Sequence, residues 1–174
     1  MGTGTAPAGA RDGQAAGPHG IIFLTPDKSI RKDEKNSAMI CEIVHDPLFL
    51  SMPSSEATEA DLSVAADLAD TLRANLDRCV GMAANMIGKR KRIIAIAKGP
   101  MVVTMLNPKI LSASGEYEAE EGCLSLEGTR KTKRYRSIRL QWQDARMKTH
   151  VGTLDGFQAQ IVQHEIDHCN GVLV

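Results

Sequence analysis

The chain has 174 residues, of which 43% are hydrophobic and 24% charged, an ordinary composition for one globular domain with a core. Its 21 Lys and Arg residues balance 21 Asp and Glu residues, so no overall field would attract DNA or an anionic membrane. The four cysteines form no CxxC pair, which favours free thiols or a metal thiolate in a reducing compartment. No apolar run is long enough for a membrane span or a signal peptide. We therefore expect a cytoplasmic protein, with neither DNA nor a membrane as partner.

The first part of the chain is predicted to be a flexible N-terminal extension over residues 1–36. Residues 1–20 contain 13 Gly, Ala or Pro residues, so burial there cannot offset the entropy of ordering the chain. A polar, charged segment follows, and the first regular apolar pattern begins near Ile40. We expect one folded domain over residues 37–174.

The remaining elements follow a helix, strands, helix order. Residues 54–77 predict an amphipathic helix with a capping-box-like start at Thr58 and Asp61, because apolar residues recur at helical spacing: Leu62, Ala65, Leu68, Ala69, Leu72 and Leu76. Short β-rich runs predict strands at 92–97, 101–107, 109–114 and 137–144. A last helix is expected from about Asp155 to Cys169, stopped by Asn170 and Gly171. This order predicts an α+β fold with mainly antiparallel sheets packed around the C-terminal helix.

The segment QHEIDH near the end of the chain suggests a metal site. His164 and His168 are four residues apart, so a helix places both imidazoles on one face, beside Glu165. Phe157 and Ile161 continue the same stripe, which would wall the site with apolar side chains. The alternative to a metal site is two ordinary helical histidines with a glutamate on the protein surface. A zinc-dependent peptidase would need a third ligand after His168, and none of the six residues that follow is suitable.

The best candidate for the third ligand lies upstream, in the segment EEGCLSLEG. Cys123 is in this segment, whereas Cys169 is rotated about 100° from His168 on the helix. Cys41 and Cys79 lie in or near apolar segments, where a buried, inert thiol is the usual outcome. Three protein ligands with one open position are typical of catalytic metal sites. A cation there activates water, and Glu165 is placed to move its proton, so we expect metal-assisted hydrolysis of an amide.

Three segments, at residues 79–88, 120–128 and 163–168, resemble the peptide deformylases, which remove the formyl group from N-terminal formylmethionine of new bacterial proteins. The resemblance implies that Cys123, His164 and His168 bind the metal and that Glu165 is the general acid/base. It also implies that the backbone N–H of Leu124 donates to the oxyanion. The family works with Fe(II) and accepts zinc, nickel or cobalt, and its substrates are N-formylmethionyl peptides. It implies a substrate-binding set consisting of Val80, Gly81, Met86, Glu121, Arg130, Phe157 and Ile161.

The chain departs from the family at several positions. Met86 replaces a glutamine whose amide, in the family, helps to hold the metal-bound water or the oxyanion, and a thioether has no N–H to donate. Cys79 replaces a glycine, while Asn85 is expected to face away from the site on a strand. The long C-terminal helix that some members dock on the ribosome is missing, so the ribosome remains a candidate partner only through the basic runs at 89–92 and 130–139. The alternative to a deformylase is a metal-binding or regulatory relative with weak or no deformylase activity.

Overall fold

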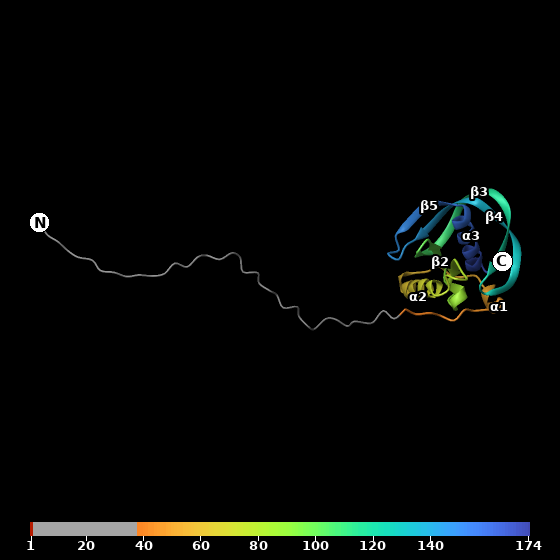
Figure 1. Cartoon of the computed structure of the whole chain (residues 1–174), viewed down its shortest axis with the longest axis horizontal. Coiled ribbons are helices and arrows are strands. Elements are labelled where there is room, and N and C mark those ends of the chain that lie inside the picture. Colours follow the sequence, from red (N-terminus) through yellow and green to blue (C-terminus); the bar gives the residue numbers. More distant parts are fainter. Residues whose placement is uncertain (2–37) are drawn as a thin grey trace. The chain divides into compact units, whose positions relative to one another are not determined.

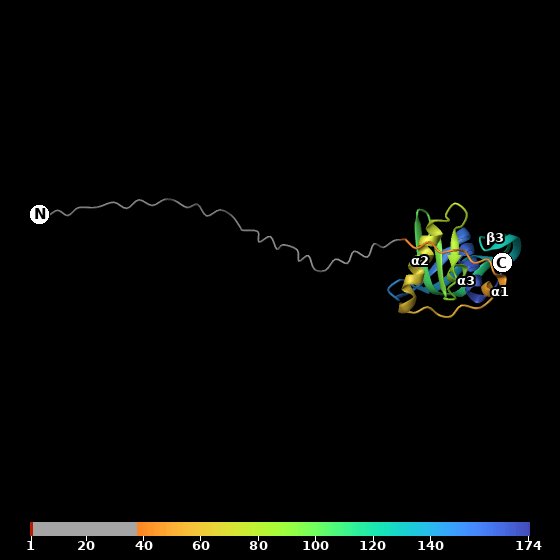
Figure 2. The same ribbon diagram turned by 90° about the horizontal axis from the view of Figure 1, so that it is seen from below.

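The computed structural model describes residue 1 and residues 38–174, so the expected extension over residues 1–36 lies almost wholly outside the described residues. The boundary of the folded domain at residue 37 therefore remains a prediction. From Ala38 onward the fold is α+β, with one five-stranded antiparallel sheet in the order β1-β2-β3-β4-β5 (Figures 1 and 2). The elements in chain order are α1 (Pro47–Leu50), the 3-10 helix η1 (Glu59–Asp61), α2 (Leu62–Arg73), β1 (Gly81–Ala83), the 3-10 helix η2 (Ala84–Ile87), β2 (Ile93–Lys98), β3 (Met101–Cys123), β4 (Leu126–Gln143), β5 (Thr149–Asp155) and α3 (Gly156–Asn170).

Strand β2 separates two hydrophobic cores because both of its faces are buried. Ile93 and Ala95 point into a core shared with α2, while Ile94 and Ile96 point into a core shared with α3. A run of apolar residues without polar alternation suits such a strand. The two helices thus cover opposite faces of the sheet at β2, and the C-terminal helix α3 is enclosed as expected from the sequence.

Helix α2 is shorter than its sequence pattern predicted. The chain enters it through η1, where the carboxylate of Asp61 accepts hydrogen bonds from the backbone N–H and the hydroxyl of Thr58, so the predicted start is confirmed. The helix ends at Arg73, and Leu76 lies beyond it with its side chain exposed. The predicted apolar stripe is otherwise correct, since Leu68 and Leu72 are fully buried.

Strands β3 and β4 form a hairpin much longer than the sequence predicted. The two runs at 101–107 and 109–114 belong to one strand, with register shifts that include one between Leu106 and Lys109. The run at 137–144 is only the end of β4, and β5 was not expected. The missed part has no hydrophobic alternation because charges of opposite sign pair across the strands, as in Lys131–Glu118 and Lys133–Glu116.

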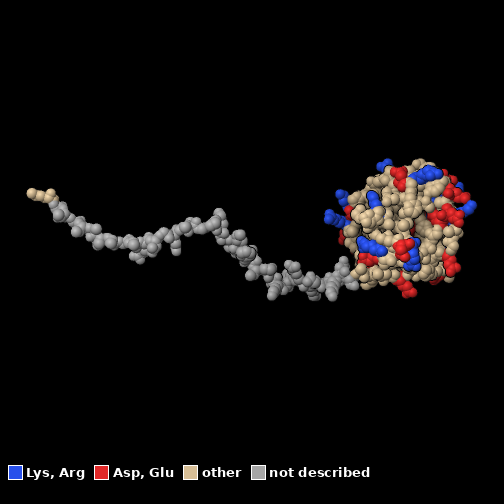
Figure 3. Space-filling view, viewed as in Figure 1, with Lys and Arg blue, Asp and Glu red and all other residues tan. Residues whose placement is uncertain are grey.

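The same pairing removes much of the basic character expected of residues 130–139. The acidic side chains of β3 lie opposite the basic side chains of β4, and Arg134 is buried. Positive and negative side chains are also interspersed over the face of the domain drawn in Figure 3. Between residues 38 and 174 no helix has both the length and the apolar character to cross a membrane.

Candidate metal centre

The site forms where the β3–β4 hairpin ends beside helix α3. Cys123 is the last residue of β3, and a two-residue turn of Leu124 and Ser125 leads into β4. The Nδ1 atom of His45 lies 3.1 Å from the carbonyl oxygen of Ser125 and ties the N-terminal segment to this turn. The hairpin therefore carries Cys123 to the face of α3 that presents the two histidines.

Cys123, His164 and His168, the three candidate ligands from the sequence, lie close together. One ligand atom from each lies within 4.8 Å of the others, and the sulfur of Cys123 is 3.2 Å from Nε2 of His168. The two imidazole rings stand edge to face, with centroids 5.0 Å apart. One thiolate and two imidazoles suit zinc or ferrous iron, and three donors leave a coordination position free. The residues present therefore fit a divalent metal ion.

A buried ion-pair network fixes the orientation of His164. Its Nδ1 donates to Glu121 at 2.9 Å, which leaves Nε2 to face the other ligands. Arg134 holds Glu121 from behind with two hydrogen bonds of 2.9 and 2.8 Å, and it also contacts Asp167 at 2.7 Å. Glu121 was expected only as a wall of the substrate channel, and its carboxylate is instead fully engaged with its neighbours. Sequence reasoning missed Arg134, which is only 4% exposed within a run of basic residues.

The surroundings shift the pKa values of these groups strongly. Burial would raise the pKa of Glu121, but hydrogen bonds from His164 and Arg134 lower it to about 2. Burial also disfavours a charged His164, yet its hydrogen bonds to Cys123 and Glu121 raise its pKa to about 10. Burial and the neighbouring His164 lower the pKa of His168 to about 3. The proton of this cluster is therefore held by His164, between Cys123 and Glu121.

Glu165 is the one acid at the site that lacks the support given to Glu121. Its side chain is 3% exposed, and its Oε2 atom has no hydrogen-bond partner among the described residues. Burial raises its pKa to about 7, a value suited to a group that takes and returns a proton near neutral pH. Gly81 allows this arrangement because a Cβ atom there would lie 2.5 Å from Oε1 of Glu165 and 2.6 Å from Cγ2 of Ile161.

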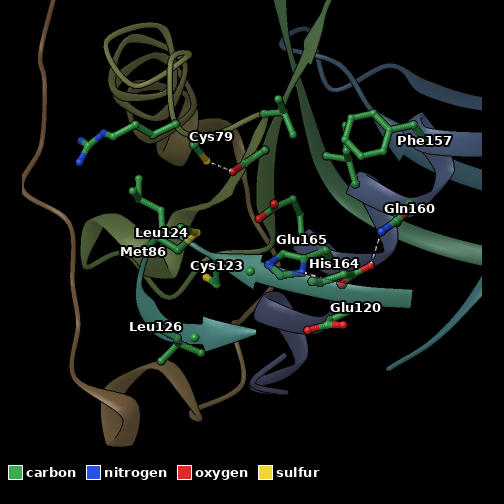
Figure 4. A pocket seen from close by; sticks show the side chains of 17 residues that line it. Cys79, Met86, Glu120, Cys123, Leu124, Leu126, Phe157, Gln160, His164 and Glu165 are labelled. Carbon is green, nitrogen blue, oxygen red and sulfur yellow. Dashed lines mark hydrogen bonds and ion pairs between the residues drawn. The ribbon is translucent and has the colours of Figure 1, made fainter. Parts of the chain in front are cut away.

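A cavity of about 590 Å³ opens in front of these groups (Figure 4). Cys123, His164 and Glu165 line it, whereas His168 lies behind them and is fully buried. Arg130 does not line the cavity, so its assignment as a substrate contact gains no support from its position. The other residues expected from the sequence to bind substrate or the oxyanion do line it: Val80, Gly81, Met86, Glu121, Leu124, Phe157 and Ile161.

The wall opposite α3 contains two sulfur atoms, those of Met86 and Cys79. The sequence predicted only Met86 at the site. Met86 lies in η2 with 1% exposure, and its sulfur accepts a hydrogen bond of 3.4 Å from the N–H of Ala83. Cys79 was expected to be an inert buried thiol, but it lines the cavity, where its thiol donates to the carbonyl of Gly81 at 2.7 Å. Burial, together with the charge of Glu165, raises the pKa of Cys79 to about 12, so the thiol keeps its proton.

Asn85 does not lie on a strand, as predicted, but in η2, where it is completely buried. Its amide nitrogen donates to the carbonyl of His168 at 2.9 Å and to that of Leu50 at 3.4 Å. Both N–H groups therefore hold the end of α3 and the helix α1. Asn85 is not available to replace the missing glutamine amide inside the cavity.

Comparison with known proteins agrees with this site. The family model described as polypeptide deformylase matches residues 39–174. A peptide deformylase of Clostridium beijerinckii is 52% identical over 136 residues, which cover 78% of this chain and 100% of that protein. A peptide deformylase of Heliobacterium modesticaldum is 38% identical over 108 residues, which cover 62% of this chain and 70% of that protein.

Solved structures give the same result. A class I type b peptide deformylase of Acinetobacter baumannii, solved with bound Met-Ala-Ser, superposes with a TM-score of 0.69 at 29% identity, covering 78% of this chain and 97% of that one. The peptide deformylase of Thermotoga maritima superposes with a TM-score of 0.68 at 30% identity, covering 78% of this chain and 94% of that one. The chain therefore belongs to the peptide deformylase family.

Proposed function

We propose that this chain is a metal-dependent hydrolase that removes the formyl group from N-formylmethionine at the start of nascent polypeptides and releases formate. The observation that carries the proposal is the convergence of Cys123, His164 and His168 next to a carboxyl group, that of Glu165, whose Oε2 has no partner among the described residues. Cys123, His164 and Glu165 line a cavity that can admit a peptide end. Relatives at up to 52% identity carry the name of this activity.

The proposed metal ligands are Cys123, His164 and His168, with Fe(II) as the native ion and zinc, nickel or cobalt as substitutes. When bound, such an ion supplies Lewis-acid polarisation and an activated water. Glu121 and Arg134 hold His164 in the tautomer that turns Nε2 toward the ligand cluster. Metal binding would require Cys123 as a thiolate and both imidazoles neutral, so the ion would displace the proton that His164 otherwise holds.

Glu165 is proposed to move the proton. Because its pKa lies near 7, it can accept a proton from the attacking water and deliver it to the amine that leaves. The backbone N–H of Leu124, in the turn that follows Cys123, is the proposed donor to the developing oxyanion. The apolar side chains of Val80, Phe157 and Ile161 are proposed to receive the methionine side chain. Glu121 and Met86 complete the walls, and Arg130 is proposed only as a contact to substrate beyond the cavity.

The proposal also implies a location. Formylated chain ends appear as nascent proteins leave the ribosome, so the expected compartment is the cytoplasm, and the ribosome is a candidate partner during translation. The cross-strand ion pairs of β3 and β4 leave residues 130–139 less suited to RNA than their sequence suggested. The catalytic domain is proposed to span residues 37–174.

The experiment is formate release from formyl-Met-Ala-Ser by the full chain, loaded anaerobically with Fe(II) or with nickel. Glu165→Gln is the matched control, since it keeps the size of the side chain and removes the proton-accepting carboxylate. We expect the variant to keep stoichiometric metal and to lose turnover by about 10²–10⁴. Equal, negligible formate release by the two metal-loaded proteins would contradict the proposal.

A second candidate function has one specific observation in its favour. The thioether of Met86 cannot donate a hydrogen bond, and the amide of the adjacent Asn85 is engaged elsewhere. The chain would then be a metal-binding member of the family with weak or no deformylase activity, acting as a binding or regulatory protein. The same assay decides between the two, because this candidate predicts bound metal without formate release.

A further inference from the structure

Besides His164 and Glu165, helix α3 presents one polar side chain to the cavity, that of Gln160. Phe157, Gln160, Ile161 and His164 stand at positions i, i+3, i+4 and i+7, so they share one face of the helix, and all four line the cavity. Phe157 and Ile161 are hydrocarbon, and Val80 also lines the cavity. Gln160, which is half-buried, therefore places an amide on the helix face that carries the apolar side chains of the proposed methionine pocket (Figure 4).

The amide of Gln160 is held at both ends. The hydroxyl of Tyr117 donates to its oxygen at 2.9 Å, and its nitrogen donates to Oε1 of Glu121 at 2.9 Å. The carboxylate of Glu121 accepts only, so the amide nitrogen must face it. Because Arg134 holds Glu121 in turn, the amide of Gln160 cannot rotate out of the wall without breaking this chain of hydrogen bonds.

One hydrogen on this nitrogen is left over. A side-chain amide has two N–H donors and two acceptor lone pairs, and the structure uses one donor and one acceptor of Gln160. The immobilised amide therefore keeps a spare donor and a spare lone pair at a half-buried position that lines the cavity.

We propose that Gln160 is a specificity-determining residue, whose fixed amide makes the first side-chain pocket accept a polar atom at the end of the substrate side chain. The most informative substrate is formylmethionine sulfoxide, because its S–O oxygen is a strong acceptor where the thioether sulfur is a weak one. The inference rests on the proposed function, since it takes the first side chain of a formyl peptide to enter beside Phe157 and Ile161.

The physical expectation follows from the cost of unpaired polar groups. A pocket of hydrocarbon alone would reject the sulfoxide, because the S–O group would lose its water without gaining a partner. A site that already holds a fixed donor pairs that group at little cost in entropy. Replacing the donor by a hydrocarbon of similar size should therefore lower activity on the sulfoxide more than activity on methionine.

The test compares kcat/KM for formyl-Met-Ala-Ser and formyl-Met(O)-Ala-Ser in the wild type and in Gln160→Leu, with the same metal. Any effect of the substitution on the catalytic centre cancels in the ratio of the two substrates. We expect the wild type to prefer methionine by less than about tenfold, and Gln160→Leu to raise that preference by a further factor of about 10–100. An unchanged ratio would overturn the inference.

Gln163→Leu is the matched control, because this glutamine lies on the same helix but is hydrogen-bonded to the backbone of Tyr135 and Ala159 and does not line the cavity. Its substitution should lower stability and leave the substrate ratio unchanged. Tyr117→Phe provides a second variant if Gln160→Leu folds poorly. It frees the amide oxygen of Gln160 at a half-buried position, and we expect a smaller shift of the ratio in the same direction.

A binding measurement separates this inference from the proposed function. Calorimetry with Met-Ala-Ser and Met(O)-Ala-Ser on the cobalt-loaded protein reports the pocket without any turnover. Absence of formate release together with the expected ratio of Kd values would contradict the deformylase proposal and support the role of Gln160. Normal formate release with equal effects of Gln160→Leu and Gln163→Leu on that ratio would support the deformylase proposal and contradict the role of Gln160. A sulfoxide peptide that fails to bind would also contradict the role of Gln160.

Discussion

The two walls of the cavity are built on different principles. On the α3 side, charged groups other than Glu165 pair with one another, as in the ion pairs of Arg134 with Glu121 and Asp167. On the β1–η2 side, the groups nearest the site are a glycine and two sulfur atoms, those of Cys79 and Met86. The first wall holds its side chains in place before any ligand binds, whereas the second contributes shape and few hydrogen bonds.

This difference separates two requirements of the site. Metal binding needs ligands in fixed orientations, and the α3 wall supplies them through Glu121, which accepts from His164, Arg134 and Gln160. Stabilisation of a developing charge needs a free donor, which the thiol of Cys79 and the thioether of Met86 supply weakly or not at all. Substitutions in the network of Glu121 and Arg134 should therefore change metal binding and stability, and those on the β1–η2 wall should change the rate.

The largest effect is expected from Gly81→Ala on the sulfur-lined wall. The added methyl group would lie 2.5 Å from Oε1 of Glu165, so the carboxyl must move. Turnover should fall by about 10²–10⁴ while metal content is retained, because the two side chains that must move, Glu165 and Ile161, are not metal ligands. Steady-state kinetics beside metal analysis checks this expectation.

The control for that substitution is Gly152→Ala in β5, where the methyl group would meet the ring of Trp142 at 3.3 Å, away from the cavity. It should cost stability without a specific loss of turnover. Equal loss of turnover in the two variants would mean that the tight approach of β1 to Glu165 has no special role.

A change on the α3 wall should act on stability first. Arg134→Met leaves Glu121 and Asp167 without their buried partner, and breaking such a pair costs about 3–5 kcal/mol of the free energy of unfolding. Urea unfolding followed by circular dichroism measures the loss. Arg136→Met is the matched control, since the exposed Arg136 only stacks on the ring of Tyr117 at 4.9 Å and should cost less than about 1 kcal/mol. Similar losses in the two variants would show that the network adds no stability.

Met86→Gln should give the β1–η2 wall the hydrogen-bonding capacity that it lacks compared with the α3 wall. A glutamine of similar size would give the β1–η2 wall a hydrogen-bond donor inside the cavity, and one such donor is worth about 10² in kcat. We expect kcat for formyl-Met-Ala-Ser to rise by about that factor with little change in metal content. A wild type that is already fast and gains less than threefold would mean that another group, such as the N–H of Leu124, is sufficient by itself.

The contrast between local and long-range patterns also explains what the sequence could and could not predict. His164, Glu165 and His168 were correctly grouped because a helix fixes their relative positions over four residues. Arg134 and Gln160 were missed because their contact with Glu121 depends on the fold of the whole hairpin. In the register of β3 and β4, Glu121 lies opposite Arg130 and Arg134 lies opposite Tyr117, so cross-strand neighbours alone do not indicate that pair.

The predicted lengths of the strands were wrong for a related reason. Hydrophobic alternation marks a strand only where one face is buried. In the β3–β4 hairpin, both faces are largely exposed around residues 111–116 and 127–131. Its pattern is instead one of opposite charges across the strands. Asn85 was misplaced because a 3-10 turn of four residues leaves no periodicity that a sequence pattern could reveal.

The smallest effect should come from these exposed ion pairs of the hairpin, which provide the opposite limit to Arg134. Lys133 and Glu116 approach to 3.1 Å, but their side chains are 78% and 50% exposed, so water and salt screen the attraction. Lys133→Ala should leave the free energy of unfolding almost unchanged, and a double-mutant cycle with Glu116→Ala isolates the pair. A coupling energy as large as the loss in Arg134→Met would contradict this view of the hairpin. It would mean that charge pairing alone stabilises strands outside the core, and that the stability of the fold does not depend mainly on the two cores and the buried network of the α3 wall.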